Sequence, residues 1–224
     1  MSRIGNKLKM LQKFLWRTTP PEQTIAKILW RQLVEAARAP IFYQEFTVPD
    51  HAAARFEMVV IHAYLLFARL KSLPPNVSHF TKPIADALFT QMTQDFEQNL
   101  RQMGVGDLRV GAKIKELMAA FYSRIVAYDR CFSENNNRAV DDLAEKLHQN
   151  IWGDEPMPDT AAKAGARHLA EYMISARAYL DSLSYDAMMG KDGAPSVATA
   201  MNMCVTHNSA EAMFPNINWP IPVS

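Results

Sequence analysis

Cysteine is scarce in this chain, which has only Cys131 and Cys204 among its 224 residues. Two cysteines so far apart form no framework of spacings, and 49% hydrophobic residues supply a core that needs no disulfide. We therefore expect two reduced thiols, which suits the cytoplasm. A large excess of charge of one sign is also missing. The net charge is +1, so the whole molecule lacks the positive excess of a nucleic-acid-binding protein, and we expect no DNA partner.

Long apolar runs are missing as well. The longest covers residues 58–68, is interrupted only by His62, and is much shorter than the roughly 20 residues that a membrane-spanning helix requires. The N-terminus carries basic residues, but no apolar run ending in small residues follows them, so no cleavable signal is apparent. The sequence predicts a protein that is soluble or at most peripheral to a membrane.

A glycine cluster near the middle of the chain is the nearest approach to a phosphate-binding motif. Gly106 and Gly111 precede Lys113, but no Ser or Thr follows the lysine and no strand pattern precedes the glycines. We interpret the cluster as the joint between two helices. In that case Gly104 adopts the left-handed conformation that ends the first helix, and Asp107 accepts a hydrogen bond from the second.

Metal and catalytic motifs are also absent. Glu145 and His148 have the spacing of a di-iron helix motif, but a di-iron site needs that motif twice. Cys204 and His207 form a lone pair where a zinc site needs four ligands. No nucleophile elbow, zinc-protease helix or dinucleotide fingerprint is present. We expect no catalytic residue, no metal and no cofactor.

Helical periodicity is what the sequence does contain. Thirteen prolines divide it into blocks without a convincing strand pattern, and we expect helices at about 22–38, 51–72, 82–103, 108–133, 137–152 and 159–184. Asp50 is expected to cap the second of these helices and Thr81 the third, with Pro83 close to its start. The predicted fold class is all-α, with a single compact helical domain of about six helices. This domain spans 22–190, between a basic amphipathic N-terminal arm (1–21) and an irregular, Pro-containing C-terminal tail (191–224).

The helix predicted at 51–72 is apolar around its whole circumference, which indicates a central position. Two alternatives remain open for it: the other helices cover it completely, or it leaves a partly open apolar groove. His62, among apolar neighbours, is interpreted as a hydrogen-bonded core histidine, with a role as ligand or base as the alternative. The helix at 108–133 carries one apolar stripe, and its lysines fall mostly on the other side.

The first seventeen residues combine basic and apolar side chains. The basic residues are Arg3, Lys7, Lys9, Lys13 and Arg17, and no acidic residue occurs before Glu22. Between them, apolar residues recur at near-helical spacing: Ile4, Leu8, Leu11, Leu15 and Trp16. This composition favours contact with an anionic membrane or with ribosomal RNA. A solvated, frayed terminus is the alternative.

Four stretches carry a resemblance to a known family: PIFYQEFTVPD, ARFEMVVIHAYLLFARLK, the long stretch from ALFTQMTQDF to FYSRIVAYD, and more faintly FPNINWPIP. On them the chain resembles the ubiquinol-cytochrome c chaperone family, assembly factors for the cytochrome bc1 complex. The resemblance covers about residues 40–132 closely and 133–184 loosely. It is nearer to bacterial than to mitochondrial members.

The resemblance implies an all-helical assembly chaperone and not an enzyme. Such a protein binds newly made cytochrome b and holds it until haem insertion and assembly proceed. The implied partners are cytochrome b, the ribosome, an anionic membrane surface and a smaller partner protein. With the basic arm on the membrane, we expect a cytoplasmic protein that is peripheral at the inner face of the cytoplasmic membrane.

In this setting we expect helices 51–72 and 108–133 to line a groove for a client helix. Its expected residues are Arg55, Phe56, Met58, His62, Leu65, Leu66, Met103, Asp107, Lys113, Lys115, Met118, Phe121, Tyr122 and Arg124, of which Lys113, Lys115 and Arg124 form the rim. The methionines suit an adaptable surface, although methionine is also an ordinary core gap filler. Two rival functions are a helical enzyme with a dispersed site around His62 and Arg55, and an RNA-binding regulator working through the arm.

Overall fold

The computed structural model describes residues 20–133, 138–153, 155–189, 201 and 204. All regular secondary structure within these residues is helical, which confirms the predicted all-α class. The helices are α2 (Pro21–Ala37), α3 (Pro40–Gln44), α4 (Ala52–Ser72), α5 (Pro75–Gln102), α6 (Asp107–Ser133), α7 (Ala139–Ile151), α8 (Asp159–Ser182) and α9 (Tyr185–Met188). The six predicted helices are all found, whereas the one-turn helices α3 and α9 were not predicted.

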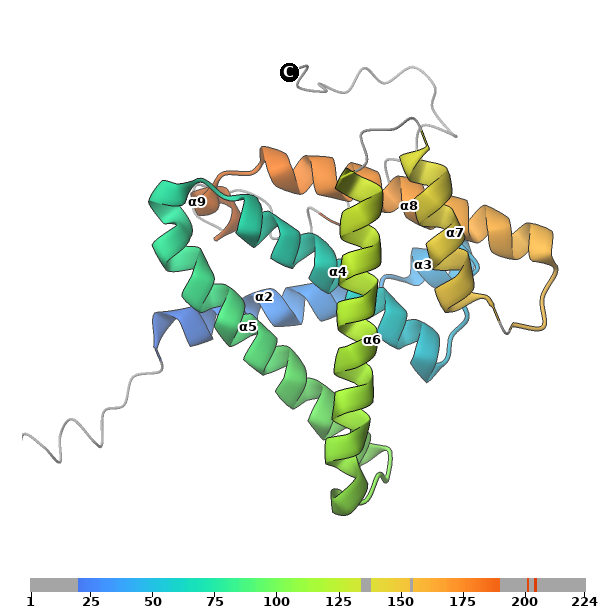
Figure 1. The fold of residues 1–224 in the computed structure, drawn as a ribbon, viewed down its shortest axis with the longest axis horizontal. Coiled ribbons are helices and arrows are strands. Elements are labelled where there is room, and N and C mark those ends of the chain that lie inside the picture. Colours follow the sequence, from blue (N-terminus) through green and yellow to red (C-terminus); the bar gives the residue numbers. More distant parts are fainter. Residues whose placement is uncertain (1–19, 134–137, 154, 190–200, 202–203, 205–224) are drawn as a thin grey trace, which may run out of the picture.

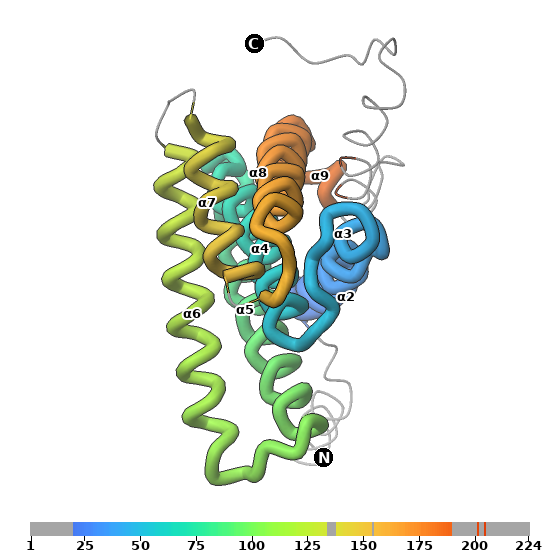
Figure 2. Tube along the Cα trace, turned by 90° about the vertical axis from the view of Figure 1, so that its right-hand side faces the viewer, coloured from blue at the N-terminus to red at the C-terminus, as the bar shows by residue number. Residues whose placement is uncertain are grey.

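Helix α4 lies in the middle of the fold. It packs against α2, α5, α6, α7 and α8, and Figures 1 and 2 show α6 with α7 on one side of it and α2 with α3 on the other. Residues 60–66 are buried without interruption. Because a fully buried large apolar side chain stabilises the fold by about 1.5–3 kcal/mol, this helix anchors the core. The prediction of a central helix is confirmed.

The predicted start of the third helix was wrong. Helix α5 begins at Pro75, seven residues earlier, and runs through Pro83 in its interior. Thr81 is therefore not a capping residue; it is buried within α5, and its hydroxyl donates to the Ser78 carbonyl at 3.3 Å. Pro75 at the first position suits a helix start, and burial of residues such as Ile84 offsets the hydrogen bond that Pro83 cannot make.

The predicted cap of α4 was also wrong by one residue. His51 precedes the helix, and its Nδ1 accepts a hydrogen bond from the Ala54 N–H at 3.3 Å. Asp50 instead accepts from the Arg55 guanidinium at 2.6 Å. An imidazole nitrogen can replace the expected carboxylate here because only an acceptor is required.

The joint between α5 and α6 follows the prediction in its main feature. Gly104 has φ = 82° and ends α5, while the Val105 N–H donates back to the Leu100 carbonyl at 3.0 Å. Asp107 becomes the first residue of α6, and its carboxylate pairs with Arg101, which also binds Glu97. The two long helices thus form a hairpin.

Candidate functional site

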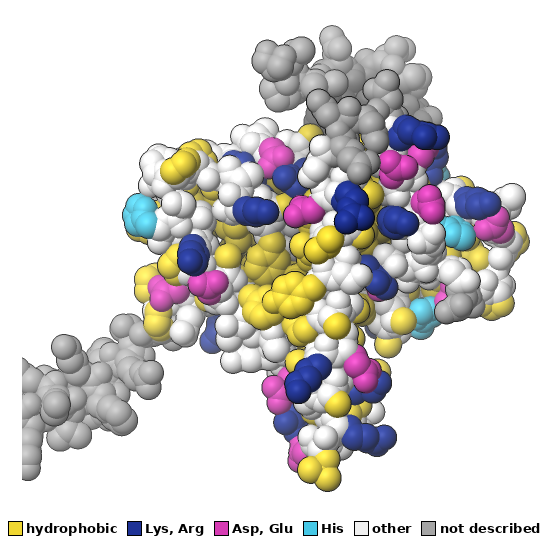
Figure 3. All heavy atoms as spheres, viewed as in Figure 1, with side chains coloured by type: hydrophobic (Ala, Val, Ile, Leu, Met, Phe, Trp, Pro, Cys, Tyr) yellow, Lys and Arg dark blue, Asp and Glu magenta, His cyan; other side chains and the backbone are white. Residues whose placement is uncertain are grey.

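The two long helices of the hairpin enclose a wedge. Helices α5 and α6 meet at the glycine joint and separate along their length, while α4 passes behind them (Figure 1). Because the helices diverge, α5 and α6 cannot cover each other fully at the wide end. Figure 3 shows apolar side chains gathered in the hollow between them.

Four aromatic rings, one from α4, one from α5 and two from α6, connect the walls of this wedge. The Phe121 ring centroid lies 6.2 Å from that of Phe67 and 6.3 Å from that of Phe89. Tyr122 lies 6.1 Å from Phe89. Tyr122 is 55% exposed, and Val126, one turn further along the same face of α6, is 59% exposed. Large apolar side chains therefore face solvent at the mouth of the wedge.

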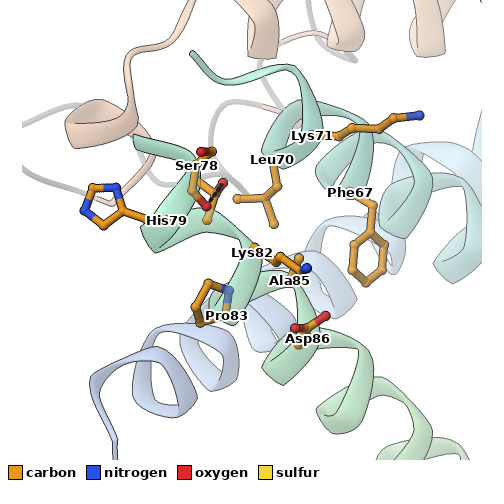
Figure 4. Close-up of a pocket in the computed structure, with 10 residues that line it drawn as sticks. Phe67, Leu70, Lys71, Ser78, His79, Lys82, Pro83, Ala85 and Asp86 are labelled. Atoms are coloured by element: carbon orange, nitrogen blue, oxygen red, sulfur yellow. Dashed lines mark hydrogen bonds between the residues drawn. The ribbon is translucent and has the colours of Figure 1, made fainter. Parts of the chain in front are cut away.

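A pocket of about 820 Å³ continues the wedge between the end of α4 and the start of α5. Its lining is mainly apolar and includes Phe67, Leu70, Pro83 and Ala85, with Lys82 and Asp86 among the charged residues. Figure 4 shows Phe67 and Leu70 pointing from α4 toward α5. We call this continuous surface the apolar groove: Phe67, Leu70, Ala85, Phe89, Phe121, Tyr122 and Val126.

Four of the expected client-binding residues lie behind this surface. Met58, His62, Leu65 and Leu66 are completely buried, so they support the groove from within the core and do not form its surface. Phe121 is 3% exposed and closes the floor of the wedge. Side chains with no exposed area cannot contact a partner while the helices hold this arrangement.

His62 has two well-formed hydrogen bonds in the core. Its Nδ1 lies 2.7 Å from the Met58 carbonyl oxygen, which can only accept, so Nδ1 carries the proton. Its Nε2 lies 2.8 Å from the Tyr172 hydroxyl, which therefore donates to it. Complete burial lowers the pKa of His62 to about 4, because the charged ring would lose its hydration. These contacts support the interpretation of a core histidine.

Arg124 makes an ion pair with α4 that the sequence did not reveal. Its guanidinium binds both carboxylate oxygens of Glu57, at 3.0 and 3.2 Å. Glu57 is only 5% exposed, and its burial raises the pKa of this carboxyl although Arg124 opposes the effect. Arg124, expected at the rim of a groove, thus fastens α6 to α4 on the side away from Tyr122.

Arg55 and Phe56 lie at the beginning of α4, away from the apolar groove. Arg55 pairs with Asp50 and lines a separate, polar pocket of about 360 Å³, while the Phe56 ring packs on Phe96 at 5.5 Å. The enzymatic alternative placed a site around His62 and Arg55. These two residues bind different partners, because His62 bonds to Met58 and Tyr172 whereas Arg55 bonds to Asp50.

The remaining expected residues divide between the groove and the hairpin joint. Met118 is half-buried and accepts from the Thr93 hydroxyl at 3.9 Å between α5 and α6. Four others, Met103, Asp107, Lys113 and Lys115, are exposed at or near the joint. The basic residues of the arm, Arg3 to Arg17, lie outside the described residues.

The described residues contain no metal-ligand cluster and no helix suited to crossing a membrane. No group of three or more His, Cys, Asp and Glu side chains is placed to hold a metal ion there. His148 instead lies 3.2 Å from Asp159, and Glu145 accepts from Gln149 at 3.1 Å. None of the described helices combines the length and apolarity that crossing a membrane demands.

Sequence reasoning missed one ion-pair partner and five groove residues, namely Phe67, Leu70, Ala85, Phe89 and Val126. Phe67, Phe89 and Val126 fit a helical apolar stripe, but their partners come from three different helices, so periodicity alone could not join them. Glu57 stood out only as an acidic residue inside an otherwise apolar segment, and such a residue usually requires a cationic partner when buried.

Residues 44–193 match the protein family described as Ubiquinol-cytochrome C chaperone. Among solved structures, the Cbp3 homolog from Brucella abortus is similar, with 29% sequence identity and a TM-score of 0.63 over 82% of this chain and 94% of that chain. No curated protein gives a significant match.

Proposed function

Because the chain belongs to the ubiquinol-cytochrome c chaperone family, we propose that it binds newly synthesised cytochrome b and promotes assembly of the bc1 complex through the apolar groove. The observation that carries this proposal is the exposure of Tyr122 and Val126 above a continuous apolar floor. Contiguous exposed apolar surface of this kind marks an interaction site in a folded protein.

The chemistry of the client fits the chemistry of the groove. A transmembrane helix presents about 20 apolar residues, and before insertion each large side chain left in water forfeits roughly 1.5–3 kcal/mol. A surface that covers such a segment must be apolar and must accept different side chains. Aromatic rings on three helices provide area, and Met118, being unbranched and polarizable, provides adaptability.

The shape of the groove suits one helical segment. Diverging walls with an apolar floor resemble the grooves that take amphipathic or apolar helices side-on. The client would rest on Phe67 and Phe89, with Tyr122 and Val126 along one side and the pocket at Leu70 receiving a protruding side chain. Lys82 and Asp86 at the pocket would remain hydrated.

Recovery of cytochrome b with the tagged full-length protein tests this function. We expect Tyr122→Asp and Val126→Asp each to reduce recovery about tenfold, because a carboxylate in an apolar contact must lose its hydration. Ser123→Asp is the matched control, since it places the same charge on the neighbouring exposed position of α6. Unchanged recovery of cytochrome b with both groove variants would show that the apolar groove does not bind the client.

The basic arm is proposed to bring the protein to the site of client synthesis. Its five cations suit contact with anionic lipid or the ribosome and would hold the protein peripherally at the inner face of the cytoplasmic membrane. A smaller partner protein is proposed by the same family resemblance. Removal of residues 1–17 should reduce membrane and ribosome co-sedimentation of the folded chain.

A further inference from the structure

The end of the α5–α6 hairpin exposes two large apolar side chains. Met103 is 66% exposed, and Leu108 is 101% exposed, on opposite sides of the turn at residues 104–107. Figure 1 shows this end projecting beyond the other helices, so no described part of the chain can cover it. We call residues 103–108 the hairpin tip.

Side-chain contacts and a left-handed glycine shape the hairpin tip. Arg101 binds the carboxylates of Glu97, on its own helix, and of Asp107, across the turn. Gly104 supplies the left-handed residue of the turn. These contacts close the turn, and Met103 and Leu108 are exposed on either side of it.

Cations lie just above these apolar side chains. Arg109 and Lys115 are exposed and form no ion pair with another described residue, while Lys113 is paired with Glu116 at 2.6 Å. Figure 3 shows basic and acidic groups side by side along this end of the molecule, with apolar atoms at its extremity. The acidic groups Glu97, Asp107 and Glu116 are paired with Arg101 or Lys113, so Arg109 and Lys115 are left as the cations above the apolar end.

We propose that the hairpin tip inserts into the surface of a membrane that contains anionic lipid. At about 1.5 Å per helical residue, Lys113 and Lys115 stand roughly 7–11 Å above Leu108 along α6. Apolar elements that bind membrane surfaces reach about 5–10 Å below the headgroups. With Leu108 at that depth, the ammonium groups lie level with the lipid phosphates.

This placement goes beyond the proposed function and does not depend on it. With the hairpin tip in the lipid surface, α6 stands upright and the apolar groove opens above the lipid, widening away from it. Phe121, the groove residue of α6 nearest the tip in sequence, is then about 20 Å above Leu108 along the helix. A protein partner at the tip is the competing occupant, and the test below separates it.

Flotation of the full-length protein with vesicles tests the proposal. Vesicles of phosphatidylcholine with about one third phosphatidylserine should float the wild type, and Met103→Asp with Leu108→Asp should reduce the bound fraction at least tenfold. Replacing Arg109 or Lys115 by Gln should each cost about fivefold at low salt, since one surface cation contributes about that factor. Pure phosphatidylcholine should bind weakly.

Val126→Asp is the matched control, because it adds a charge at an exposed apolar position at the other end of α6. This variant should float with the vesicles as the wild type does but should recover less cytochrome b. The tip variants should recover cytochrome b as the wild type does but should float less with the vesicles. Equal flotation of wild type and the tip double variant would overturn the proposal, whether or not the N-terminal arm carries the remaining binding.

A direct readout of insertion uses Leu108→Cys labelled with an environment-sensitive fluorophore. The native thiols Cys131 and Cys204 are buried and should label slowly. A blue shift with anionic vesicles, quenched by brominated acyl chains, is the expected result. A shift that requires a protein from the cell extract and never occurs with lipid alone would place a protein at the tip instead.

Discussion

Acid should destabilise this protein through His62 before its carboxylates are protonated. In the folded state His62 is neutral, because Nδ1 donates to the Met58 carbonyl and Nε2 accepts from Tyr172 within the core. Protonation would turn Nε2 into a donor facing a hydroxyl that already donates. Burial accordingly lowers the pKa to about 4 from its ordinary value of 6.5.

The magnitude follows from the two pKa values. Because the folded-state pKa is the lower one, the unfolded chain takes up this proton first, so the contribution of His62 is complete above pH 6.5 and is lost as pH falls toward 4. A difference of about 2.5 at about 1.4 kcal/mol per pKa unit gives roughly 3 kcal/mol in total, of which about 2 kcal/mol is gone by pH 5.

Urea unfolding at pH 7.5, 6, 5 and 4.5 measures this loss. His62→Gln stays neutral throughout and offers both a donor and an acceptor. Its unfolding free energy should be lower than that of the wild type at pH 7.5. Between pH 7.5 and pH 5, however, the variant should lose about 2 kcal/mol less unfolding free energy than the wild type does. His62→Leu, which cannot take up a proton, provides a second variant if Gln does not fold. Parallel pH profiles for wild type and the His62 variants would refute the assignment of His62 as a neutral core residue.

Further predictions concern close packing, the buried ion pair and the methionines. Gly165→Ala should destabilise the fold by about 3 kcal/mol in urea unfolding, because the new Cβ would lie 2.2 Å from the Phe46 carbonyl oxygen; Gly111→Ala, with no atom within 4 Å, should instead stabilise by up to about 1 kcal/mol. Arg124→Ala should cost about 3 kcal/mol by leaving Glu57 buried and unpaired, and adding Glu57→Gln should recover part of it; an additive double variant would contradict the pairing. Met118→Ala should weaken client recovery with little change in the melting temperature. Met92→Ala, at a completely buried position, should lower the melting temperature with little change in client recovery by the folded protein.

The helices could be read from the sequence because their signals are local. Apolar spacing located α4 and α6 to within one residue at each end, and the left-handed conformation of Gly104 was predicted from its position between two helical segments. The start of α5 was misplaced because Pro83 was taken as a first-turn residue. A helix interior tolerates proline where packing offsets the missing hydrogen bond, and that packing is not visible in local sequence.

The candidate site was harder to predict because it depends on how helices cross. An apolar residue on α4 faces either the core or the groove according to the angle of its neighbours, and the sequence of α4, apolar on all sides, does not distinguish Leu66 from Phe67. In the same way, Lys113 and Arg124 share one helix, yet one is exposed near the tip and the other fastens α6 to Glu57.

The most direct test of the account is photo-crosslinking from the apolar groove in living cells. A photoreactive residue at Tyr122 or Val126 should capture cytochrome b while it is being made, and one at the exposed Lys163 on α8 should not. Capture from the two groove positions and not from Lys163 is the predicted result. Capture of cytochrome b only from Lys163, or from no position of a folded and expressed protein, would contradict the claim that this groove holds the client.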